Sequence, residues 1–449
     1  MDRNQMFLQL RRQLLEEEYT HLNPRQKAAV FACSRPLLIL AGAGSGKTTV
    51  LVNKLGYLIR YGNAYHSNRV PEGLTDEDLT FLRDCQTDAG KKEDPRYRKL
   101  IADDPYNPYQ LLAITFTNKA AGEMRERIEA KFRINASDLW ALTFHSTCVR
   151  ILRKFADLLG YTKQFTIYDE NDSLKLTDTC IREFGLSDRY ASKFVKSIIS
   201  KAKGAYLTPD QLETEYKNRS FPKVPALYRR YQQALRESDA MDFDDLIFNT
   251  VKVLTEFPQA ADAVNHRFRY VLVDEYQDTN PLQYRLVTLL AKGGQLCVVG
   301  DDDQSIYRFA GASIRNILDF EHSFPDAEVV RLEQNYRSTQ TILNAANSVI
   351  ANNTNRKGKN LWSDKDIGNK IKYHQMATQY EEGDFIAKNI LSEIGGNKKK
   401  FNDFCVLYRT HAQSNSIEMA LKGNGIPYRV YGGTWTVSMD SAGIKIRFP

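Results

Sequence analysis

Lysine, threonine and several glycines follow an apolar run near the N-terminus in a pattern that can grip a nucleoside triphosphate. The run Leu37–Leu40 predicts a buried strand, and the residues after it suit a turn into a helix. They are Ala41, Gly42, Ala43, Gly44, Ser45, Gly46, Lys47, Thr48 and Thr49. Glycines let backbone N–H groups surround phosphate oxygens, and the helix N-terminus adds a positive dipole. Lys47 would reach the β- and γ-phosphates, and the Thr48 hydroxyl would ligate Mg2+.

This loop departs from the usual eight-residue pattern at its first position, where Ala41 replaces glycine. A glycine-rich turn between a strand and a helix can also be purely structural, so a second half of the site is required. Tyr270–Val273 predicts another buried strand, and Asp274 and Glu275 follow it directly. Open α/β sheets place their ligands at this end of a strand. Asp274 would hold Mg2+ through its water shell, and Glu275 would orient and deprotonate the water that attacks the γ-phosphate.

A third strand is predicted for Gln295–Gly300, and it ends in a run of three aspartates and a glutamine. The Gln304 amide at the end of this run could sense the γ-phosphate. Each acidic cluster alone is more simply a solvated loop, but three strand ends with matched triphosphate chemistry favour nucleotide hydrolysis. The catalytic set predicted from these strand ends is Lys47, Asp274, Glu275 and Gln304.

Aromatic and polar residues follow further predicted strands, at Leu111–Thr115 and Trp140–Thr143, and also follow the third strand. Flat side chains offer stacking platforms for unpaired bases, while hydroxyls, amides and helix N-termini bind the phosphates between them. Each aromatic residue alone is more often part of a core, and a lone histidine is more often structural. Together they favour single-stranded nucleic acid as a ligand. The candidates are Phe116, Thr117, Asn118, His145, Tyr307 and Phe309.

The composition is that of a water-soluble enzyme, with 42% hydrophobic and 26% charged residues. A chain of 449 residues exceeds what one core supports, so we expect about two to four domains. No apolar run approaches ~18 residues and no signal-peptide core is present, so we expect no membrane segment. The six cysteines are scattered without a Cys-x-x-Cys pair, which indicates neither zinc nor disulfides and fits a reducing cytoplasm. The net charge of +7 permits a polyanionic partner.

Several blocks of the sequence together resemble the UvrD/Rep/PcrA-type superfamily 1 DNA helicases. They are Leu22–Gln26, the phosphate loop, Ile114–Ala121, Thr143–Ser146, Met241–Leu246, Val273–Asp278, Val299–Tyr307, Leu332–Thr339 and Val406–Thr410. The blocks run in the order of the family and cover nearly the whole chain, so chance agreement is negligible. The resemblance implies an α/β fold of the P-loop NTPase (RecA-like) type, in which a parallel sheet carries an inserted helical subdomain and a partial second RecA-like domain follows.

The resemblance also implies roles for particular residues. Gln26 would recognise adenine, Tyr336 would stack on the base, and Arg337 would reach the γ-phosphate as an arginine finger from a second motor domain. Contacts to the strand would come from Phe116, Asn118, His145, Tyr307 and Arg409. The implied activity is translocation in the 3′ to 5′ direction along single-stranded DNA, driven by ATP and Mg2+, with duplex junctions as further partners in repair or replication.

The expected organisation begins with a first motor domain over residues 1–150, interrupted by a helical subdomain over 151–235 and completed over 236–325. Helix-period segments at Glu170–Glu183 and Ser187–Lys203, with a break at Gly204, support the insertion. Residues 326–449 would begin an incomplete second domain. Its expected strands lie near Val329–Leu332, Lys370–His374 and Phe404–Tyr408, and its expected helices lie near Gln340–Asn352, Glu381–Glu393 and Gln413–Asn424.

The chain departs from the family pattern at four places. Residues 62–109 form a polar stretch where the family usually has a short connection, and a loop of that length is commonly functional or mobile, so we expect a surface elaboration there. Phe309-Ala310 stands where Trp-Arg is common, and His411 stands where Asn is frequent. After Thr434 the match ends, whereas family members continue through further motifs. We therefore expect a truncated helicase that binds ATP more reliably than it hydrolyses it and does not unwind DNA by itself.

Two other functions stay open at this point. A catalytically silent module could bind single-stranded nucleic acid under the control of a nucleotide, and it would show saturable strand binding without phosphate release. An unrelated nucleotide enzyme, such as a small-molecule kinase, would need an acceptor pocket and a lid, of which the sequence gives no sign. A helicase instead predicts that single-stranded DNA stimulates ATP hydrolysis by the full-length parent and that Glu275→Gln abolishes it.

Overall fold

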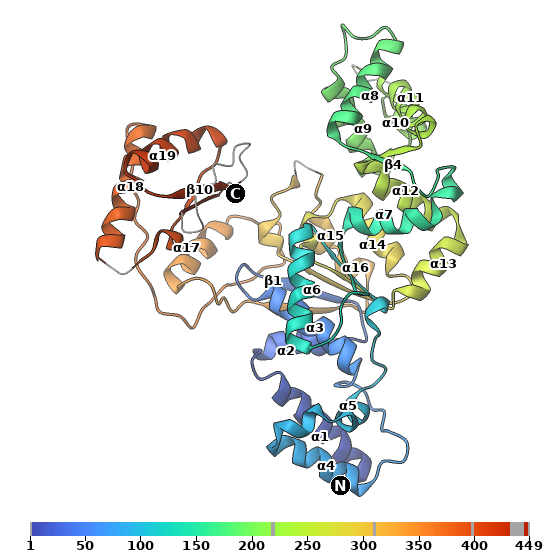
Figure 1. The fold of residues 1–449 in the computed structure, drawn as a ribbon, viewed down its shortest axis with the longest axis vertical. Helices are drawn as coiled ribbons and strands as arrows, with labels where there is room; N and C mark the ends of the chain where they lie inside the picture. The colour runs from blue at the N-terminus through green and yellow to red at the C-terminus, as the bar shows by residue number, and fades with distance from the viewer. Residues whose placement is uncertain (1, 217–220, 309–310, 397–398, 432–443, 448–449) are drawn as a thin grey trace. The chain divides into compact units, whose positions relative to one another are not determined.

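The computed structural model describes residues 2–216, 221–308, 311–396, 399–431 and 444–447. The chain divides into two compact units, Met1–Asn369 and Lys370–Pro449 (Figure 1). The first unit contains the large sheet and the helices that cover it. The second unit contains a small three-stranded sheet with helices of its own.

The first unit is built on a six-stranded sheet with the order β3-β2-β6-β7-β1-β8. The strands are β1 (Leu37–Ala41), β2 (Leu111–Thr115), β3 (Trp140–Thr143), β6 (Tyr270–Val273), β7 (Gln295–Gly300) and β8 (Glu328–Leu332). Their pairings are parallel, for example with Ile39 beside Val299 and Ile114 beside Val273. Continuous apolar runs form the strands β1, β2, β6 and β7, because both faces of a parallel sheet are covered. The predicted α/β class is confirmed, and so are the predicted strands at β1, β2, β3, β6 and β7.

Alternate residues of each strand face opposite layers of helices, because successive side chains of a strand point to opposite faces. Ile39 and Leu272 belong to the core beneath the first layer, and Leu38 and Val271 belong to the core beneath the second. The first layer includes α2 (Pro24–Phe31), α3 (Lys47–Tyr61) and α6 (Asn118–Phe132). The second includes α7 (Phe144–Phe155), α12 (Phe243–Glu256) and α14 (Pro281–Leu290). The sheet that carries the predicted site is therefore packed between two layers of helices.

Strand β8 belongs to the first sheet, although the sequence pattern suggested that Val329–Leu332 would open a second domain. It pairs with β1 along its whole length, from Leu37 beside Glu328 to Ala41 beside Leu332. An alternating strand of this kind carries no mark of the sheet that it joins, because its pattern only requires one buried face. The chain therefore stays with the first body through β8, and the division into compact units comes after Asn369.

Residues 62–109 contain helices, although their length and polar composition suggested a loop. They contain α4 (Asp76–Thr87) and α5 (Pro95–Ile101), which pack with α1 (Arg3–Glu18). Leu79 and Leu82 of α4 are buried in one core with Phe7 and Leu14 of α1. Many charged residues surround these few apolar positions, so the composition resembles a loop even though the spacing of the apolar residues is helical.

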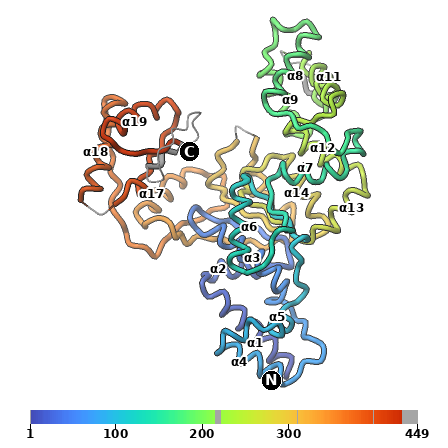
Figure 2. The backbone as a smooth tube through the Cα atoms, viewed as in Figure 1, coloured from blue at the N-terminus to red at the C-terminus, as the bar shows by residue number. Residues whose placement is uncertain are grey.

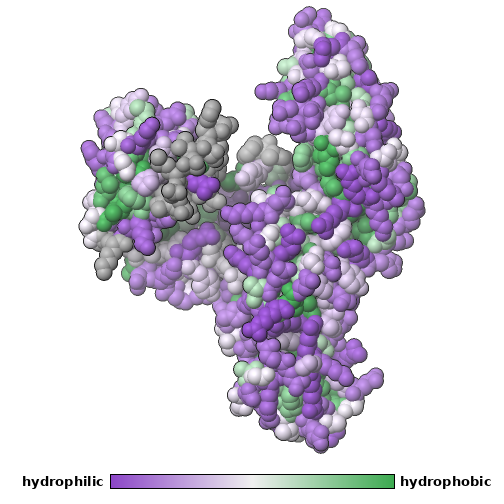
Figure 3. Space-filling model, in the orientation of Figure 1, coloured by the Kyte–Doolittle hydropathy of each residue, from purple (hydrophilic) through white to green (hydrophobic). Residues whose placement is uncertain are grey.

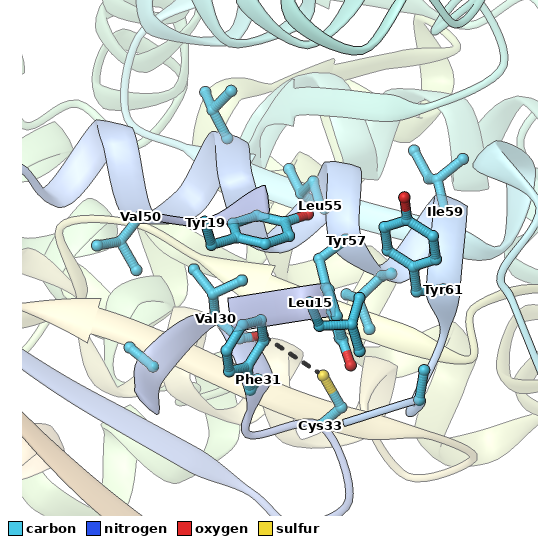
Figure 4. Close-up of a cluster of buried hydrophobic side chains, with 14 of the residues drawn as sticks. Leu15, Tyr19, Val30, Phe31, Cys33, Val50, Leu55, Tyr57, Ile59 and Tyr61 are labelled. Atoms are coloured by element: carbon cyan, nitrogen blue, oxygen red, sulfur yellow. Dashed lines mark hydrogen bonds between the residues drawn. The ribbon is translucent and has the colours of Figure 1, made fainter. Parts of the chain in front are cut away.

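Aromatic residues join α1 to α2 and α3. Figure 4 shows Tyr19, Phe31 and Tyr57 side by side in this core. Their ring centroids lie 5.5 Å apart for Tyr19 and Phe31, 6.0 Å for Tyr19 and Tyr57, and 5.2 Å for Phe31 and Tyr57. Edge-on and tilted pairs at such distances stabilise a core beyond their burial alone. The helical body made by α1, α4 and α5 is thus continuous with the core beneath the sheet.

A second group of helices lies between β3 and β6 in the sequence. It consists of α8 (Glu170–Glu183), α9 (Ser192–Gly204), α10 (Pro209–Tyr216) and α11 (Val224–Glu237), drawn in green in Figure 2. These helices share a core of their own, which includes Ile199 and Tyr231. The chain enters and leaves them through β4 (Thr166–Tyr168) and β5 (Ala240–Asp242), which pair in parallel. The predicted helix at Glu170–Glu183 is confirmed, whereas the next helix begins at Ser192 and not at Ser187.

The second unit is a smaller α/β body. Its strands β9 (Cys405–Leu407), β10 (Tyr428–Tyr431) and β11 (Ile444–Arg447) pair in parallel with β11 in the middle. Ile390 of α18 (Gln379–Gly396) and Leu421 of α19 (His411–Gly423) lie in its core. The strand predicted at Lys370–His374 is wrong, because these residues have no regular structure. Its alternating residues Ile371 and Tyr373 are both exposed.

The surface shown in Figure 3 is mostly hydrophilic, with small scattered apolar patches. Among the described residues, none of the helices combines the length and the apolarity that crossing a membrane requires. All six cysteines are free thiols, of which Cys405 is exposed and the other five are buried.

Candidate nucleotide and nucleic-acid site

The phosphate loop connects β1 to α3 in the way that the sequence predicts. Gly44 and Gly46 have φ angles of +68° and +86°, a region that glycine enters without strain. A Cβ atom at Gly44 would lie 2.6 Å from Nδ2 of Asn335, so glycine is also required for space. The loop ends at Lys47, the first residue of α3, where the N–H groups of the first helical turn have no intrahelical partner. This arrangement suits an anion.

The two acidic residues after β6 lie beside this loop. Lys47 Nζ is 2.9 Å from Oε2 of Glu275, although 228 residues separate them in the sequence. Asp274 Oδ1 accepts a hydrogen bond from the N–H of Glu275 at 2.9 Å. Glu275 has a φ angle of +49°, a left-handed conformation that costs a non-glycine residue roughly 1–3 kcal/mol. The strained turn after β6 therefore brings the Glu275 carboxylate to the lysine of the phosphate loop.

The carboxyl groups at this site differ in their pKa values. Burial and the Glu275 carboxylate raise the pKa of Asp274 to about 6. Burial and Glu275 also raise the pKa of Asp278 to about 6. Burial alone would raise the pKa of Glu275, but the Lys47 ammonium and the Gln277 amide outweigh it, so this pKa lies below its usual value. Glu275 is therefore ionised at neutral pH, while at Asp274 burial and the Glu275 carboxylate outweigh the opposing effect of the Lys47 ammonium.

A magnesium ion would fit the chemistry of these residues. Asp274 is a carboxylate in a buried setting, and a divalent cation beside it would favour its ionised form. Thr48 stands in the first turn of α3 with its hydroxyl oxygen as a possible ligand. Oxygen ligands of these two kinds, together with phosphate oxygens, are what Mg2+ takes in nucleotide sites. Thr48 and Asp274 are thus the residues that would hold the ion.

Gln277 joins two strand ends through its amide. Its Nε2 donates to Glu275 Oε2 at 2.8 Å, and its Oε1 accepts the N–H of Asp301 at 2.9 Å. Gln304 Nε2 in turn donates to Oδ2 of Asp301. A Cβ atom at Gly300 would lie 2.9 Å from Gln277 Oε1, so the glycine at the end of β7 leaves room for this amide. The predicted γ-phosphate sensor, Gln304, is therefore linked to the acid after β6.

The segment after β8 packs directly on the phosphate loop. Asn335 Nδ2 donates to the carbonyl of Ala43 at 2.6 Å, and Asn335 Oδ1 accepts the N–H of Arg337 at 2.8 Å. The N–H of Tyr336 donates to the carbonyl of Gly44 at 2.9 Å. These bonds place Arg337 next to the phosphate loop, where Arg337 is exposed. Its predicted role as an arginine finger stays a prediction.

Gln26 and Tyr336, the predicted adenine contacts, meet through Asn23. Asn23 and Gln26 form a reciprocal cap at the start of α2, and Gln26 Nε2 donates to the carbonyl of Ser45 at 3.0 Å. Asn23 Nδ2 donates to the Tyr336 hydroxyl at 2.8 Å. Tyr336 remains 45% exposed, so part of its side chain is accessible to a ligand. The geometry allows stacking on Tyr336, and base recognition by Gln26 stays a prediction.

Several residues predicted to contact nucleic acid share a cavity with the acidic residues after β6. A cavity of about 680 Å3 is lined by Glu275, Gln277, Asp278 and Gln304 together with Phe116, Thr117 and Tyr307. Phe116 is 37% exposed and Tyr307 is 46% exposed. Thr117 caps α6 by accepting the N–H of Ala120, and Asn118 is the first residue of this helix. One cavity thus reaches from the catalytic candidates to the stacking candidates.

Three further nucleic-acid candidates are His145, Phe309 and Arg409. His145 lies in the first turn of α7 against Phe243, with ring centroids 5.4 Å apart, and burial lowers its pKa. Phe309 lies outside the described residues. Arg409 lies in the second unit, where its N–H donates to Gln413 Oε1 at 2.9 Å. The roles of these three residues stay predictions.

Comparison with known families agrees with the site. A family model described as the UvrD/REP helicase N-terminal domain matches residues 22–70 and 95–325. The chain belongs to the UvrD/REP helicase family. A second model of this family, the UvrD-like helicase C-terminal domain, matches residues 330–435. The N-terminal match leaves out residues 71–94, which include α4.

Individual relatives support the assignment to the UvrD/REP family. The ATP-dependent DNA helicase PcrA of Bacillus subtilis is 41% identical over 415 residues, which cover 92% of this chain and 50% of the relative. The ATP-dependent DNA helicase UvrD1 of Mycobacterium tuberculosis is 44% identical over 425 residues, with 92% and 50% covered. PcrA of Staphylococcus aureus is 40% identical over 415 residues. The chain spans about half the length of the curated relatives that it matches.

Sequence reasoning did not single out several residues that build this helicase site. Asn23, Gln277 and Asn335 all lie inside the blocks that resemble the family, yet none was assigned a role. Their signal is weak, because a short amide residue is common in any turn and its partners lie far away in the sequence. Asn335, for example, bonds to Ala43, 292 residues earlier.

Proposed function

We propose that this protein hydrolyses ATP with Lys47, Asp274 and Glu275 and uses the reaction to move 3′ to 5′ along single-stranded DNA, as a helicase of the repair or replication type. The observation that carries the proposal is the 2.9 Å contact between Lys47 Nζ and Glu275 Oε2. It joins the phosphate loop to the acid after β6 in one site. The relatives named above support it, since they bear the name of ATP-dependent DNA helicases.

The contact between Lys47 and Glu275 defines the first step. When a triphosphate enters the loop, Lys47 exchanges the Glu275 carboxylate for the β- and γ-phosphates. Glu275 then becomes more basic, because the Lys47 ammonium contributes to its lowered pKa. The released carboxylate orients a water molecule and accepts its proton during attack on the γ-phosphate. Thr48 and Asp274 would hold Mg2+, which would supply neutralisation of the phosphate charge when bound.

Coupling to DNA runs through the cavity that the catalytic and stacking residues share. Gln304 and Glu275 line it together with Tyr307 and Phe116. Only two residues separate Gln304 from Tyr307 in the sequence. A movement of Gln304 on loss of the γ-phosphate therefore reaches the base-stacking surface directly.

We keep residues 151–235 as an inserted subdomain in this proposal and start the second motor domain after β8.

The proposal is tested by measuring phosphate release from ATP with and without single-stranded DNA. DNA should stimulate the wild-type protein, and Glu275→Gln should lower kcat roughly 100-fold or more while ATP binding is kept, because the base is lost and the loop is not. Glu256→Gln, the same change at an exposed site, is the control.

Undiminished hydrolysis by Glu275→Gln would contradict the proposed mechanism. Saturable DNA binding without any phosphate release by the wild-type protein would favour a nucleotide-controlled binding module instead. Hydrolysis that ignores DNA would argue for a nucleotide enzyme of another kind.

A further inference from the structure

A basic segment after α17 (Gln340–Ile350) closes over the three aspartates that follow β7. Lys359 reaches them with a side chain that has no exposed surface. Its Nζ lies 2.8 Å from Asp301 Oδ1 and 3.0 Å from Asp303 Oδ2, and it also contacts Asp302 Oδ1. The three carboxylates lie close enough together to hold a metal ion, but here an ammonium group of the chain itself pairs with all three.

Residues next to Lys359 in the sequence also bind the aspartates after β7. Arg356 Nη2 donates to Asp303 Oδ2 at 2.8 Å and to the carbonyl of Lys359 at 2.8 Å. The backbone N–H of Lys357 donates to Asp302 Oδ2 at 2.7 Å. The segment and the aspartates both belong to the first unit. The turn after β7 is thus held by several charge-assisted bonds and not by one isolated ion pair.

Asp301 links Lys359 and its aspartate partners to the catalytic candidates. Its Oδ2 accepts a hydrogen bond from Gln304 Nε2, and its N–H donates to Gln277 Oε1 at 2.9 Å. Gln277 Nε2 donates in turn to Glu275 Oε2 at 2.8 Å. Lys359 therefore stands at the far end of a continuous set of contacts that reaches both the proposed γ-phosphate sensor and the proposed base.

The contact of Lys359 with the aspartates is ionic. Burial alone would lower the pKa of Lys359, but the carboxylates of Asp301 and Asp302 outweigh it, so this pKa lies above its usual value. Burial alone would raise the pKa of Asp302, but Lys359 outweighs it, so this pKa lies below its usual value. Without the lysine, the clustered carboxylates would repel one another and the turn that holds Gln304 would open.

We propose that Lys359 is a positioning residue for ATP hydrolysis, which fixes the Asp301 carboxylate and through it the Gln304 amide at the γ-phosphate. Lys359 itself does not touch the nucleotide. The inference rests on the proposed function and adds to it a residue that controls how the site distinguishes ATP from ADP. A lysine in a loop between two predicted elements gives no hint of this role in the sequence.

The experiment compares Lys359→Met with the wild-type protein by two measurements. The first is the ratio of affinities for AMP-PNP and ADP in the presence of Mg2+, since only AMP-PNP offers a γ-phosphate to Gln304. We expect Lys359→Met to lower this ratio about fivefold or more while the affinity for ADP stays within about twofold. The second is kcat for ATP, which should fall about 10-fold or more, because a positioned donor is displaced.

Three further variants separate positioning from stability. Lys203→Met removes another fully buried lysine, which lies 2.8 Å from both Asp242 and Asp245, so it should lower Tm without changing the affinity ratio. Gln304→Ala removes the group through which Lys359 acts, so Lys359→Met should have no further effect on the ratio in that background. Lys359→Arg keeps the charge but replaces a point charge by a planar fork, so it should lose part of the preference.

An unchanged affinity ratio in Lys359→Met, or effects that add to those of Gln304→Ala, would overturn the inference and leave the proposed function standing. If the methionine variant does not fold, the arginine variant decides, because a ratio equal to that of the wild type would overturn the inference as well. A wild-type protein that binds neither nucleotide would overturn the proposed function itself.

Discussion

Single residues at the strand ends carry opposing charges at close range. Lys47 pairs with Glu275, while Asp274 and Asp278 both have a raised pKa of about 6 because burial and the Glu275 carboxylate disfavour their ionisation. Clustered carboxyl groups whose ionisation is disfavoured destabilise the fold, but they suit the binding of a cation together with a phosphate chain. The sequence predicted the residues that lie at strand ends, since apolar runs mark where strands stop. It could not predict Lys359, because a lysine in a loop is usually solvated and its three partners looked like a solvated loop too.

Asp278 gives a pH prediction. Its pKa in the folded protein is about 6, above the ~3.9 of an unfolded chain, so its contribution to stability is present below about pH 4 and is lost as the pH rises through 6. The asparagine of Asp278→Asn cannot ionise. The free energy of unfolding of this variant, relative to that of the wild type, should therefore be roughly 1–2 kcal/mol higher at pH 7.5 than at pH 4, allowing for solvent screening. Urea unfolding at both pH values measures this.

The exposed Asp262→Asn serves as the control for Asp278→Asn, because it makes the same change outside the site. An advantage of Asp278→Asn that is equal at pH 4 and pH 7.5 would show that ionisation of Asp278 does not oppose folding.

Elements are predicted well where one physical signal dominates. The strands beneath the site are continuous apolar runs, and the structure has them at the expected residues. The strand expected at Lys370–His374 rested on alternation alone, and its residues Ile371 and Tyr373 are exposed. The helices of residues 62–109 were missed for the opposite reason. Their few apolar residues, such as Leu79 and Leu82, are buried, but charged neighbours conceal the pattern.

Leu82→Ala tests whether helix α4 is part of the core. Leu82 is fully buried with residues of α1, so the substitution should cost about 2–5 kcal/mol of unfolding free energy through the cavity that it leaves. Chemical denaturation measures the change, and Glu77→Ala on the exposed side of the same helix is the control. A cost below about 0.5 kcal/mol, as for surface changes, would mean that α4 is only loosely attached.

The molecule as a whole relies on contacts between residues far apart in the sequence. Lys47 and Glu275 meet across 228 residues, and the cavity beside them brings Phe116 and Tyr307 to the same place. The triphosphate chemistry at the ends of the predicted strands already indicated that Lys47 and Glu275 converge, and the family resemblance supported this prediction. The same resemblance misplaced β8, because it gave the order of the blocks and not the sheet to which each strand belongs.

Tyr307→Ala tests the nucleic-acid side of the cavity. Loss of one stacking platform should weaken binding of a short single-stranded DNA about 10-fold, since a stacked base contributes about 1–3 kcal/mol. Fluorescence anisotropy with a labelled oligothymidine measures this. Tyr109→Ala is a matched control, because Tyr109 is 47% exposed and Tyr307 is 46% exposed. Equal affinities of the two variants would remove Tyr307 from the DNA site.

The most direct test of a single ATP site shared by the phosphate loop and the acids after β6 is a crystal structure with Mg2+ and AMP-PNP. We expect Lys47 Nζ to leave Glu275 and contact the β- and γ-phosphates, with Mg2+ beside Thr48 and Asp274 and the Glu275 carboxylate facing the γ-phosphate. A nucleotide bound elsewhere, or a Lys47 that stays on Glu275 while the loop is filled, would contradict the account.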